Sequence, residues 1–317
     1  MILPVDRDLR KRATPGSWAR RPALCGVGTF GALILTGCVA GPRLQTPHDP
    51  VGGAPATVPA GMQYLYGSGE GAAISVQTWS ALTRYVREQV SHANSGSRIG
   101  VVLTPGATLA QPEFERCGSK PLAAVFDVDE TVLLNLGFEY NDAAYPKPYD
   151  EKRWQAWEKT GTRQVAAVPG AVEALATIRK LGVTVIFNSN RSAANASETA
   201  ASITTAGLGP AVHGETLFLA GDDATGSRKD TRRATIAAKY CVIAMGGDQL
   251  GDFSDLFNAG LAPVTRRAAA LSPEIAGKWG NGWFVMPNPV YGSALKGGFD
   301  DVFPTDKRWA PPAPPEK

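Results

Sequence analysis

The sequence predicts an α/β fold in which a parallel β-sheet is flanked by helices. The prediction depends on three short apolar runs, each followed directly by polar residues: Leu122–Phe126, Val183–Phe187 and Cys241–Met245. Continuous apolar strands separated by helices are typical of a parallel sheet that is buried on both faces. Ligands bind such sheets beyond the carboxyl ends of the strands, so the polar residues there are the first candidates for function.

Helical patterns lie between these runs. Residues 171–180 precede the second strand and residues 231–240 precede the third, as expected for helices that connect parallel strands. A further helix is predicted over about residues 71–90, with an apolar face made of Ile74, Trp79, Leu82, Tyr85 and Val86. These helices supply the layers that cover the sheet.

The first 37 residues predict an export signal. An arginine-rich start precedes an apolar run over residues 23–35, which is shorter than the roughly 20 residues of a membrane-spanning helix. The run ends in Leu35-Thr36-Gly37-Cys38, which resembles the bacterial lipobox. That resemblance implies a lipoprotein signal peptide over 1–37 and lipid chains such as palmitate on Cys38. The alternatives are a chance cysteine after an ordinary signal, or a buried core helix.

The location of the protein follows from the same segment. A lipidated Cys38 anchors the chain to a membrane of the cell envelope, and Val39 after it favours the outer membrane of a Gram-negative bacterium. Residues 38–60 are rich in Pro, Gly, Ala and Thr, which is typical of a flexible tether. We expect a folded domain over 61–306 and a disordered tail over 307–317.

Charge and cysteine content narrow the partners. Residues 1–37 carry six basic and two acidic side chains, so the remaining chain has a formal charge near −1 and no nucleic acid polymer is expected as a partner. Once Cys25 and Cys38 are assigned to the signal and the anchor, Cys117 and Cys241 remain. In an oxidising compartment they can form a disulfide, and two buried free thiols are the alternative.

The motif Asp127-Val128-Asp129-Glu130-Thr131 follows the first strand directly. Side chains alternate along an extended segment, so the carboxylates of Asp127 and Asp129 point the same way. Asp127 can attack phosphorus and form an aspartyl-phosphate. Asp129 can protonate the leaving alkoxide and then deprotonate the hydrolytic water. A calcium-binding loop or a helix cap is the alternative for this motif alone.

Polar residues near the other strand ends complete a phosphate site. Ser189 and Asn190 offer contacts to phosphoryl oxygens, and Lys229 offers positive charge to the anionic transition state. Clustered carboxylates repel one another and therefore imply a cation, and an oxygen-only set indicates a hard ion such as Mg²⁺. The predicted metal ligands are Asp127, Asp129, Asp248 and Asp252.

Together, these segments resemble the haloacid dehalogenase (HAD) superfamily of phosphohydrolases, and within it the class C acid phosphatases. The resemblance extends over about residues 61–298 and implies a Rossmann-like HAD core with a small, mainly helical cap inserted at about 133–168. The segments that carry it are VFDVDETVLLN, the pair Trp154 and Trp157, VPGAVEAL, FNSNR at 187–191, GDQLGDF, and PNPVYGS at 287–293.

The resemblance implies roles for individual residues. Asp127 is implied as nucleophile and metal ligand, Asp129 as acid/base and as donor of a backbone carbonyl to the metal, and Asp248 as metal ligand. Ser189 and Lys229 are implied as phosphate contacts. Trp154 and Tyr291 match positions that line the substrate pocket, where an aromatic wall can stack a nucleobase or nicotinamide ring. Core aromatics are the alternative for these two residues.

The chain departs from the family pattern at three places. Gln249 stands where the family has Asn, which changes the contacts near the metal. Ala294 replaces a common aromatic, which changes the substrate pocket. The segment GSRKDTRR holds a single lysine, Lys229, as the candidate for the phosphate contact.

The sequence therefore predicts a Mg²⁺-dependent phosphomonoesterase of the acid phosphatase and 5′-nucleotidase type, acting through an aspartyl-phosphate. Its expected substrates are nucleoside monophosphates or similar small phosphate esters. The alternatives are a phosphotransferase that uses the same phosphoenzyme and a non-catalytic surface binding lipoprotein. The oligomeric state stays open, with a dimer among the alternatives.

Overall fold

The computed structural model describes residues 57–92 and 99–312. The predicted signal peptide, the predicted lipidation site Cys38 and the tether up to residue 56 lie outside the described residues, as do residues 313–317 of the predicted tail. Within the described ranges, no helix combines the length and the apolar character that crossing a membrane requires.

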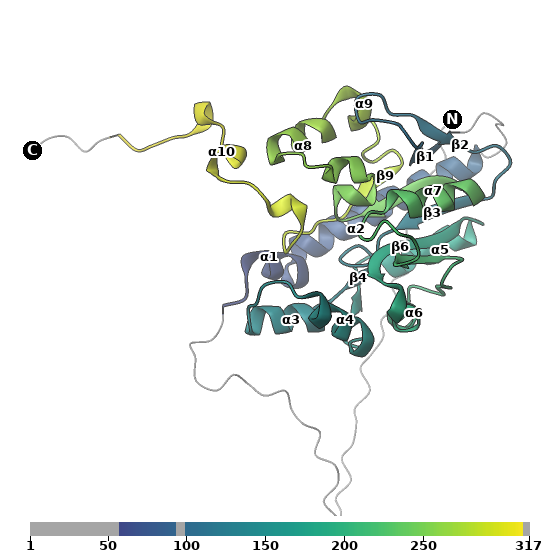
Figure 1. Cartoon of the computed structure of the whole chain (residues 1–317), viewed down its shortest axis with the longest axis horizontal. Coiled ribbons are helices and arrows are strands. Elements are labelled where there is room, and N and C mark those ends of the chain that lie inside the picture. The colour runs from purple at the N-terminus through teal and green to yellow at the C-terminus, as the bar shows by residue number, and fades with distance from the viewer. Residues whose placement is uncertain (1–56, 93–98, 313–317) are drawn as a thin grey trace, which may run out of the picture. The chain divides into compact units, whose positions relative to one another are not determined.

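A parallel sheet forms the centre of the fold (Figure 1). It has five strands in the order β7-β6-β3-β8-β9. This confirms the predicted α/β fold with a parallel sheet flanked by helices. Its strands are β3 (Leu122–Phe126), β6 (Thr184–Ser192), β7 (Leu217–Ala220), β8 (Cys241–Gly247) and β9 (Trp283–Val285).

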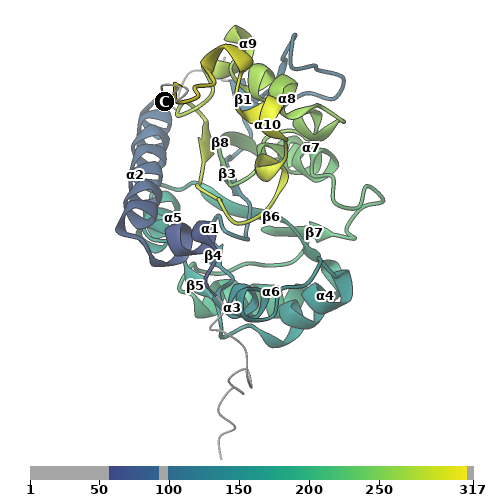
Figure 2. The same cartoon turned by 90° about the vertical axis from the view of Figure 1, so that its left-hand side faces the viewer.

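Each face of the sheet has its own core because side chains alternate along the strands. In β3, Ala124 and Phe126 face the first core, and Ala123 and Val125 face the second. Figure 2 shows α2 and α5 on one side of the sheet and α7 on the other. The first core is closed by α2 (Gly69–Ser91), α5 (Ala171–Lys180) and α6 (Ala196–Thr205), and the second by α7 (Asp230–Lys239), α9 (Pro273–Ala276), β1 (Ile99–Leu103) and β2 (Phe114–Arg116).

Helix α2 forms where the periodicity predicts it, but its buried face differs from the prediction. Ile74 is 42% exposed, whereas Ser75 at the next position is buried with Trp79, Leu82 and Val86. Burial of Ser75 is tolerated because its hydroxyl donates a hydrogen bond to the Gly71 carbonyl at 3.0 Å. The expectation that Ile74 lies on the apolar face was therefore wrong by about one residue of helix rotation.

Residues 133–168 form a separate segment between β3 and α5. The two-residue strand β4 (Leu133–Leu134) pairs antiparallel with β5 (Ala166–Ala167) and holds the two ends of the segment together. Between them lie α3 (Leu136–Ala144) and α4 (Glu151–Thr160), the latter begun by Asp150, whose side chain accepts two backbone N–H bonds. The other described helices are α1 (Ala60–Met62), α8 (Pro263–Ala270) and α10 (Phe299–Val302), with short π-helical and 3-10 turns between elements.

A disulfide joins Cys117, just after β2, to Cys241, the first residue of β8. Their Cα atoms are 4.6 Å apart, and Cys241 pairs with Leu122 at the amino end of β3. The structure thus shows one of the two alternatives left by the sequence. The bond lies at the amino ends of the strands, opposite the carboxyl ends that carry the polar residues.

Candidate active site

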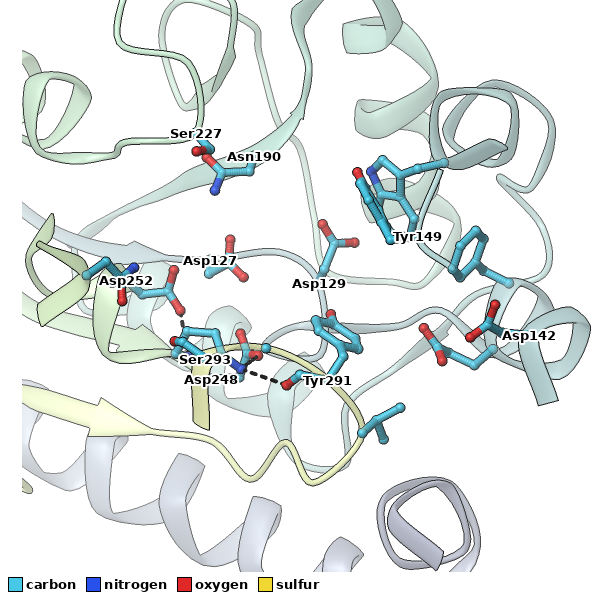
Figure 3. A pocket seen from close by; sticks show the side chains of 18 of the residues that line it. Asp127, Asp129, Asp142, Tyr149, Asn190, Ser227, Asp248, Asp252, Tyr291 and Ser293 are labelled. Atoms are coloured by element: carbon cyan, nitrogen blue, oxygen red, sulfur yellow. Dashed lines mark hydrogen bonds between the residues drawn. The ribbon is translucent and has the colours of Figure 1, made fainter. Parts of the chain in front are cut away.

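The carboxyl ends of the central strands open into a cavity of about 620 Å³. Figure 3 shows Asp127 and Asp252 on one side of this cavity, and Asp142 and Tyr149 on the far side. We call the region of Asp127, Lys229, Asp248 and Asp252 the inner end. The outer end consists of side chains from residues 133–168: Phe138, Glu139, Asp142, Lys147, Tyr149, Arg153 and Trp154.

Three carboxylates meet at the inner end. Oxygens of Asp127, Asp248 and Asp252 lie within 4.8 Å of one another, and Asp127 and Asp248 are buried. Burial raises the pKa of Asp127 well above its usual range, although Lys229 opposes the shift; burial and the charge of Asp252 raise the pKa of Asp248 to about 7. An all-oxygen set of mutually repelling carboxylates fits a hard divalent cation.

Lys229 lies directly before α7 and contacts two of these carboxylates. Its ammonium group donates a hydrogen bond to Asp127 and another to Asp252, the latter at 2.7 Å. Burial by itself lowers the pKa of Lys229. The charges of Asp127 and Asp252 raise this pKa by more than burial lowers it, so the net shift is upward. A permanent positive charge therefore stands beside Asp127.

Asp248 is fixed by neutral donors. Thr131 donates to its Oδ1 at 3.1 Å, and Asn288 and Gln249 donate to its Oδ2 at 2.7 and 3.0 Å. Gln249, the departure from the family pattern, thus contacts a predicted metal ligand directly, and its side-chain amide also reaches the Tyr291 carbonyl at 3.4 Å.

Asp129 is not part of the three-carboxylate group. Its Oδ1 accepts hydrogen bonds from Arg191 Nε and from Asn135 Nδ2, both at 2.9 Å, within an ion pair to the Arg191 guanidinium. Its Oδ2 has only a long contact of 3.4 Å from Ser189. One oxygen of Asp129 is therefore held in place and the other is left for the cavity.

Strand β6 extends to Ser192, beyond the predicted end at Phe187, and its alternation sorts four polar side chains. Ser189 and Arg191 point toward Asp129, whereas Asn188 and Asn190 accept hydrogen bonds from Arg232 at 2.8 and 2.7 Å. Asn190 lines the cavity. Ser189 is fully buried and accepts the backbone N–H of Arg191 at 3.0 Å, so its phosphate contact stays a prediction.

Glu130 has the backbone conformation that is unusual for a residue with a side chain, with φ of +52°. Its carboxylate accepts hydrogen bonds from Tyr66 at 3.2 Å, from Tyr291, and from the Asn135 backbone at 2.9 Å. Burial raises its pKa to about 7, and the charge of Asp129 adds to the shift. Glu130 thus ties the segment before α2, the segment after β9 and the start of α3 to the loop that carries Asp127 and Asp129.

The two predicted pocket aromatics both line the cavity. The Trp154 ring packs edge-to-face against Phe138, with ring centroids 4.9 Å apart, and the Arg191 guanidinium lies 5.9 Å from it. The Tyr291 hydroxyl is engaged by Glu130. Their contact with substrate stays a prediction.

Sequence reasoning assigned no role to several residues that hold the site together. They all lie inside the segments that carry the family resemblance: Glu130 and Asn135 in VFDVDETVLLN, Arg191 in FNSNR, and Asn288 in PNPVYGS. The signal was present, but a motif does not say which of its polar residues touch each other.

A sequence profile of the HAD superfamily, subfamily IIIB (acid phosphatase), matches residues 73–294, well over half of the chain. The chain belongs to this subfamily. The resemblance to HAD acid phosphatases is thereby confirmed, and the HAD subfamily IIIB match spans β3, residues 133–168 and the strand ends that line the cavity.

Individual proteins are similar to this chain in sequence or in fold. Acid phosphatase 1 of Solanum lycopersicum is 28% identical over 174 residues, a match that covers 53% of this chain and 57% of that protein. The class C acid phosphatase of Bacillus anthracis has the same fold, with a TM-score of 0.59 at 21% identity over 74% of this chain and 84% of that one. Its tungstate-bound structure gives a TM-score of 0.58 at 22% identity, covering 76% and 91%.

Proposed function

We propose that this HAD subfamily IIIB chain is a Mg²⁺-dependent phosphomonoesterase of the acid phosphatase and 5′-nucleotidase type. It acts on nucleoside monophosphates or similar small phosphate esters, and it does so at the cell envelope through the anchor predicted at Cys38. The observation that carries the proposal is that Asp127 and Asp129 line one cavity. Lys229 donates a hydrogen bond to Asp127, and Arg191 donates one to Asp129.

The first half of the reaction uses both carboxylates. An Asp127 oxygen attacks phosphorus and forms an aspartyl-phosphate while the ester P–O bond breaks. The leaving alkoxide takes a proton from Asp129, whose Oδ2 is the oxygen not held by Arg191 and Asn135. Lys229 offsets the negative charge that Asp127 and the phosphoryl group bring together.

The second half regenerates the enzyme. Asp129, now deprotonated, takes a proton from water, and the resulting hydroxide attacks the aspartyl-phosphate and releases inorganic phosphate. Asp127, Asp248 and Asp252 fit a divalent ion by their all-oxygen set, and a bound Mg²⁺ supplies positive charge to the phosphoryl oxygens. A tungstate-bound relative shows that this fold accepts an oxyanion in at least one other protein.

Phosphate release from a panel of 5′-nucleotides and an aromatic phosphate tests the proposal. We expect turnover with Mg²⁺, loss of turnover with EDTA, and recovery when Mg²⁺ is restored. Asp127→Asn keeps the shape of the side chain but removes the nucleophile, so turnover is expected to fall by at least about 1,000-fold. Excess nucleoside in the assay separates transfer to an alcohol from hydrolysis by water.

Folded, metal-loaded protein without turnover on any ester would refute the phosphatase and favour the binding lipoprotein. An Asp127→Asn variant that retains full activity would refute the aspartyl-phosphate. Thr131→Val tests the metal ligand Asp248 separately from the nucleophile, because Thr131 donates a hydrogen bond to Asp248. The concentration of Mg²⁺ needed for half-maximal turnover is expected to rise in this variant.

A further inference from the structure

The outer end of the cavity has no role in the chemistry proposed above. It is built by α3, α4 and the loop between them, which contribute both charged and aromatic side chains to the wall. A wall that faces the substrate without contacting the reacting atoms can only act on the organic part of the ester.

Glu139 is the unusual residue of this wall. It is only 5% exposed, yet it lines the cavity, and no hydrogen bond from the described residues reaches its carboxylate. Burial raises its pKa to about 8, and the charges of Glu130 and Asp142 contribute to the shift. A buried carboxylate without a partner destabilises the folded protein, so a ligand that supplies the partner gains correspondingly.

Arg153 partly offsets the charge on Glu139 but forms no hydrogen bond with its carboxylate among the described contacts. Its Nη2 forms an ion pair with Asp142 at 2.5 Å, and its guanidinium lies 4.7 Å from the centre of the Phe138 ring. Its Nε and Nη1 are buried without a partner, so Arg153 and Glu139 do not satisfy each other.

Aromatic rings line the same end of the cavity. Phe138, next to Glu139 in the chain, packs edge-to-face with Trp154 at 4.9 Å, and Tyr149 lines the cavity from the loop between α3 and α4. Aromatic faces and a carboxylate together favour a positively charged group, through cation–π attraction and a charge-assisted hydrogen bond.

We propose that Glu139 selects the leaving group, by binding a cationic amine on the organic part of the phosphate ester against the aromatic wall of the outer end. The inference rests on the proposed phosphatase function and narrows its substrates to small phosphate monoesters whose alcohol carries a positively charged nitrogen. Glu139 is a specificity residue in this scheme, since the reacting atoms lie at the inner end.

Two matched series of substrates test this inference: ω-aminoalkyl phosphates and n-alkyl phosphates of equal chain length, from two to six carbons. The measured quantity is the ratio of kcat/KM for the amine to kcat/KM for the alkyl ester, taken above a pH of about 8, where Glu139 of the free protein is ionised. The wild-type protein is expected to prefer the amine by about 10- to 100-fold at one chain length, as a charge-assisted hydrogen bond predicts. Glu139→Gln is expected to bring the ratio close to one.

Three further variants sharpen the test. Glu274→Gln removes an exposed glutamate on α9 and is expected to leave the ratio unchanged, which controls for net charge. Glu139→Asp keeps the charge but shortens the side chain, so the preferred amine should become longer. Asp142→Asn frees Arg153 to pair with Glu139, and the ratio should fall partway.

The outcomes separate this inference from the proposed function. An unchanged ratio in Glu139→Gln overturns the inference, as does an equal loss on both series, which indicates a purely structural role. A wild-type protein that hydrolyses every ester without preferring the amine also overturns it and leaves the phosphatase intact. If the protein releases phosphate neither from the two series nor from nucleotides, the proposed phosphatase function itself is refuted.

Discussion

The charged side chains at the two ends of the cavity differ in how completely they are paired within the protein. At the inner end, Lys229 pairs with Asp127 and Asp252 before any ligand arrives. Asp248 accepts hydrogen bonds from the neutral donors Thr131, Gln249 and Asn288. At the outer end, Glu139 is buried without a partner and Arg153 is only partly paired. The inner end is preorganised for one kind of chemistry, whereas the outer end leaves a contact for the ligand to complete.

The difference follows from the elements that carry each end. Asp127 and Asp248 directly follow the parallel strands β3 and β8, and Lys229 directly precedes α7. Asp252 ends the 3-10 turn Leu250–Asp252 that follows β8. Outer-end residues come from an inserted segment that is connected to the sheet through the short β4–β5 ladder. Variation in that segment can alter substrate choice while the strand ends keep the reacting groups in place.

Among the variants that compare the two ends, the largest effect is expected when the positive charge of Lys229 is removed from the inner end. Lys229→Met leaves Asp127 and Asp252 without their ammonium partner, and we expect kcat to fall by about 100- to 1,000-fold. Steady-state kinetics at saturating Mg²⁺ measure the loss. Lys239→Met, an exposed lysine at the end of the same helix, is the control and should match the wild type.

Lys229→Arg keeps the charge and guards against misfolding of the methionine variant. It should retain more activity than Lys229→Met, because a buried cation still faces Asp127. Equal activity of Lys229→Met and wild type would show that the inner end does not need this charge.

A smaller effect is expected at Asp129. Arg191→Lys keeps a positive charge but loses the planar group that holds Asp129 and Asn135 together, so we expect kcat to fall by about 10- to 100-fold with little change in KM. Arg179→Lys, which affects a single bond to the Leu208 carbonyl, is the matched control. A rise in KM with constant kcat would mean that Arg191 acts on substrate binding and not on the position of Asp129.

The smallest effect concerns the stability of the outer end. Glu139 has a folded-state pKa of about 8 against an ordinary value of 4.5, so the folded state favours the protonated form. The wild type therefore loses stability as the pH rises from about 4.5 to about 8, and Glu139→Gln lacks this loss. At pH 9 the variant should be more stable by on the order of 1 kcal/mol, or about 2–4 °C in Tm.

Thermal unfolding of both proteins at pH 4 and pH 9, without ligand, measures this difference. The two melting temperatures should converge at pH 4, where Glu139 is protonated in both the folded and the unfolded state. A variant that is less stable than the wild type at pH 9 would mean that the carboxylate has a stabilising partner and that the outer end is already satisfied.

The sequence was sufficient for the fold and for the placement of two inner-end residues directly after strands. The strand Leu122–Phe126 and the helix over 171–180 match the observed β3 and α5, and Asp127 and Asp248 follow strands as predicted. These features are local: an apolar run decides where a strand ends, and the end of a parallel strand decides where the next side chains lie.

Long-range pairing was beyond the sequence. The spacing of Asp127 and Asp129 does not reveal that Asp129 pairs with Arg191, 62 residues later, and stays apart from the other three carboxylates. Glu139 lies in the short helix Leu136–Ala144, where nothing in the pattern separates an exposed glutamate from a buried one. Both facts depend on how the inserted segment and β6 pack, which no periodicity encodes.

The disulfide between Cys117 and Cys241 closes a covalent ring across 124 positions of sequence. This ring contains Asp127, Glu139 and Lys229, and the exposed stretch over residues 146–150 lies within it. A single cut of the backbone in that stretch leaves one molecule, because the Cys117–Cys241 disulfide still links the two fragments at the amino ends of the strands. The backbone of the inserted segment can thus be cleaved while the residues at both ends of the cavity remain in one covalently linked molecule.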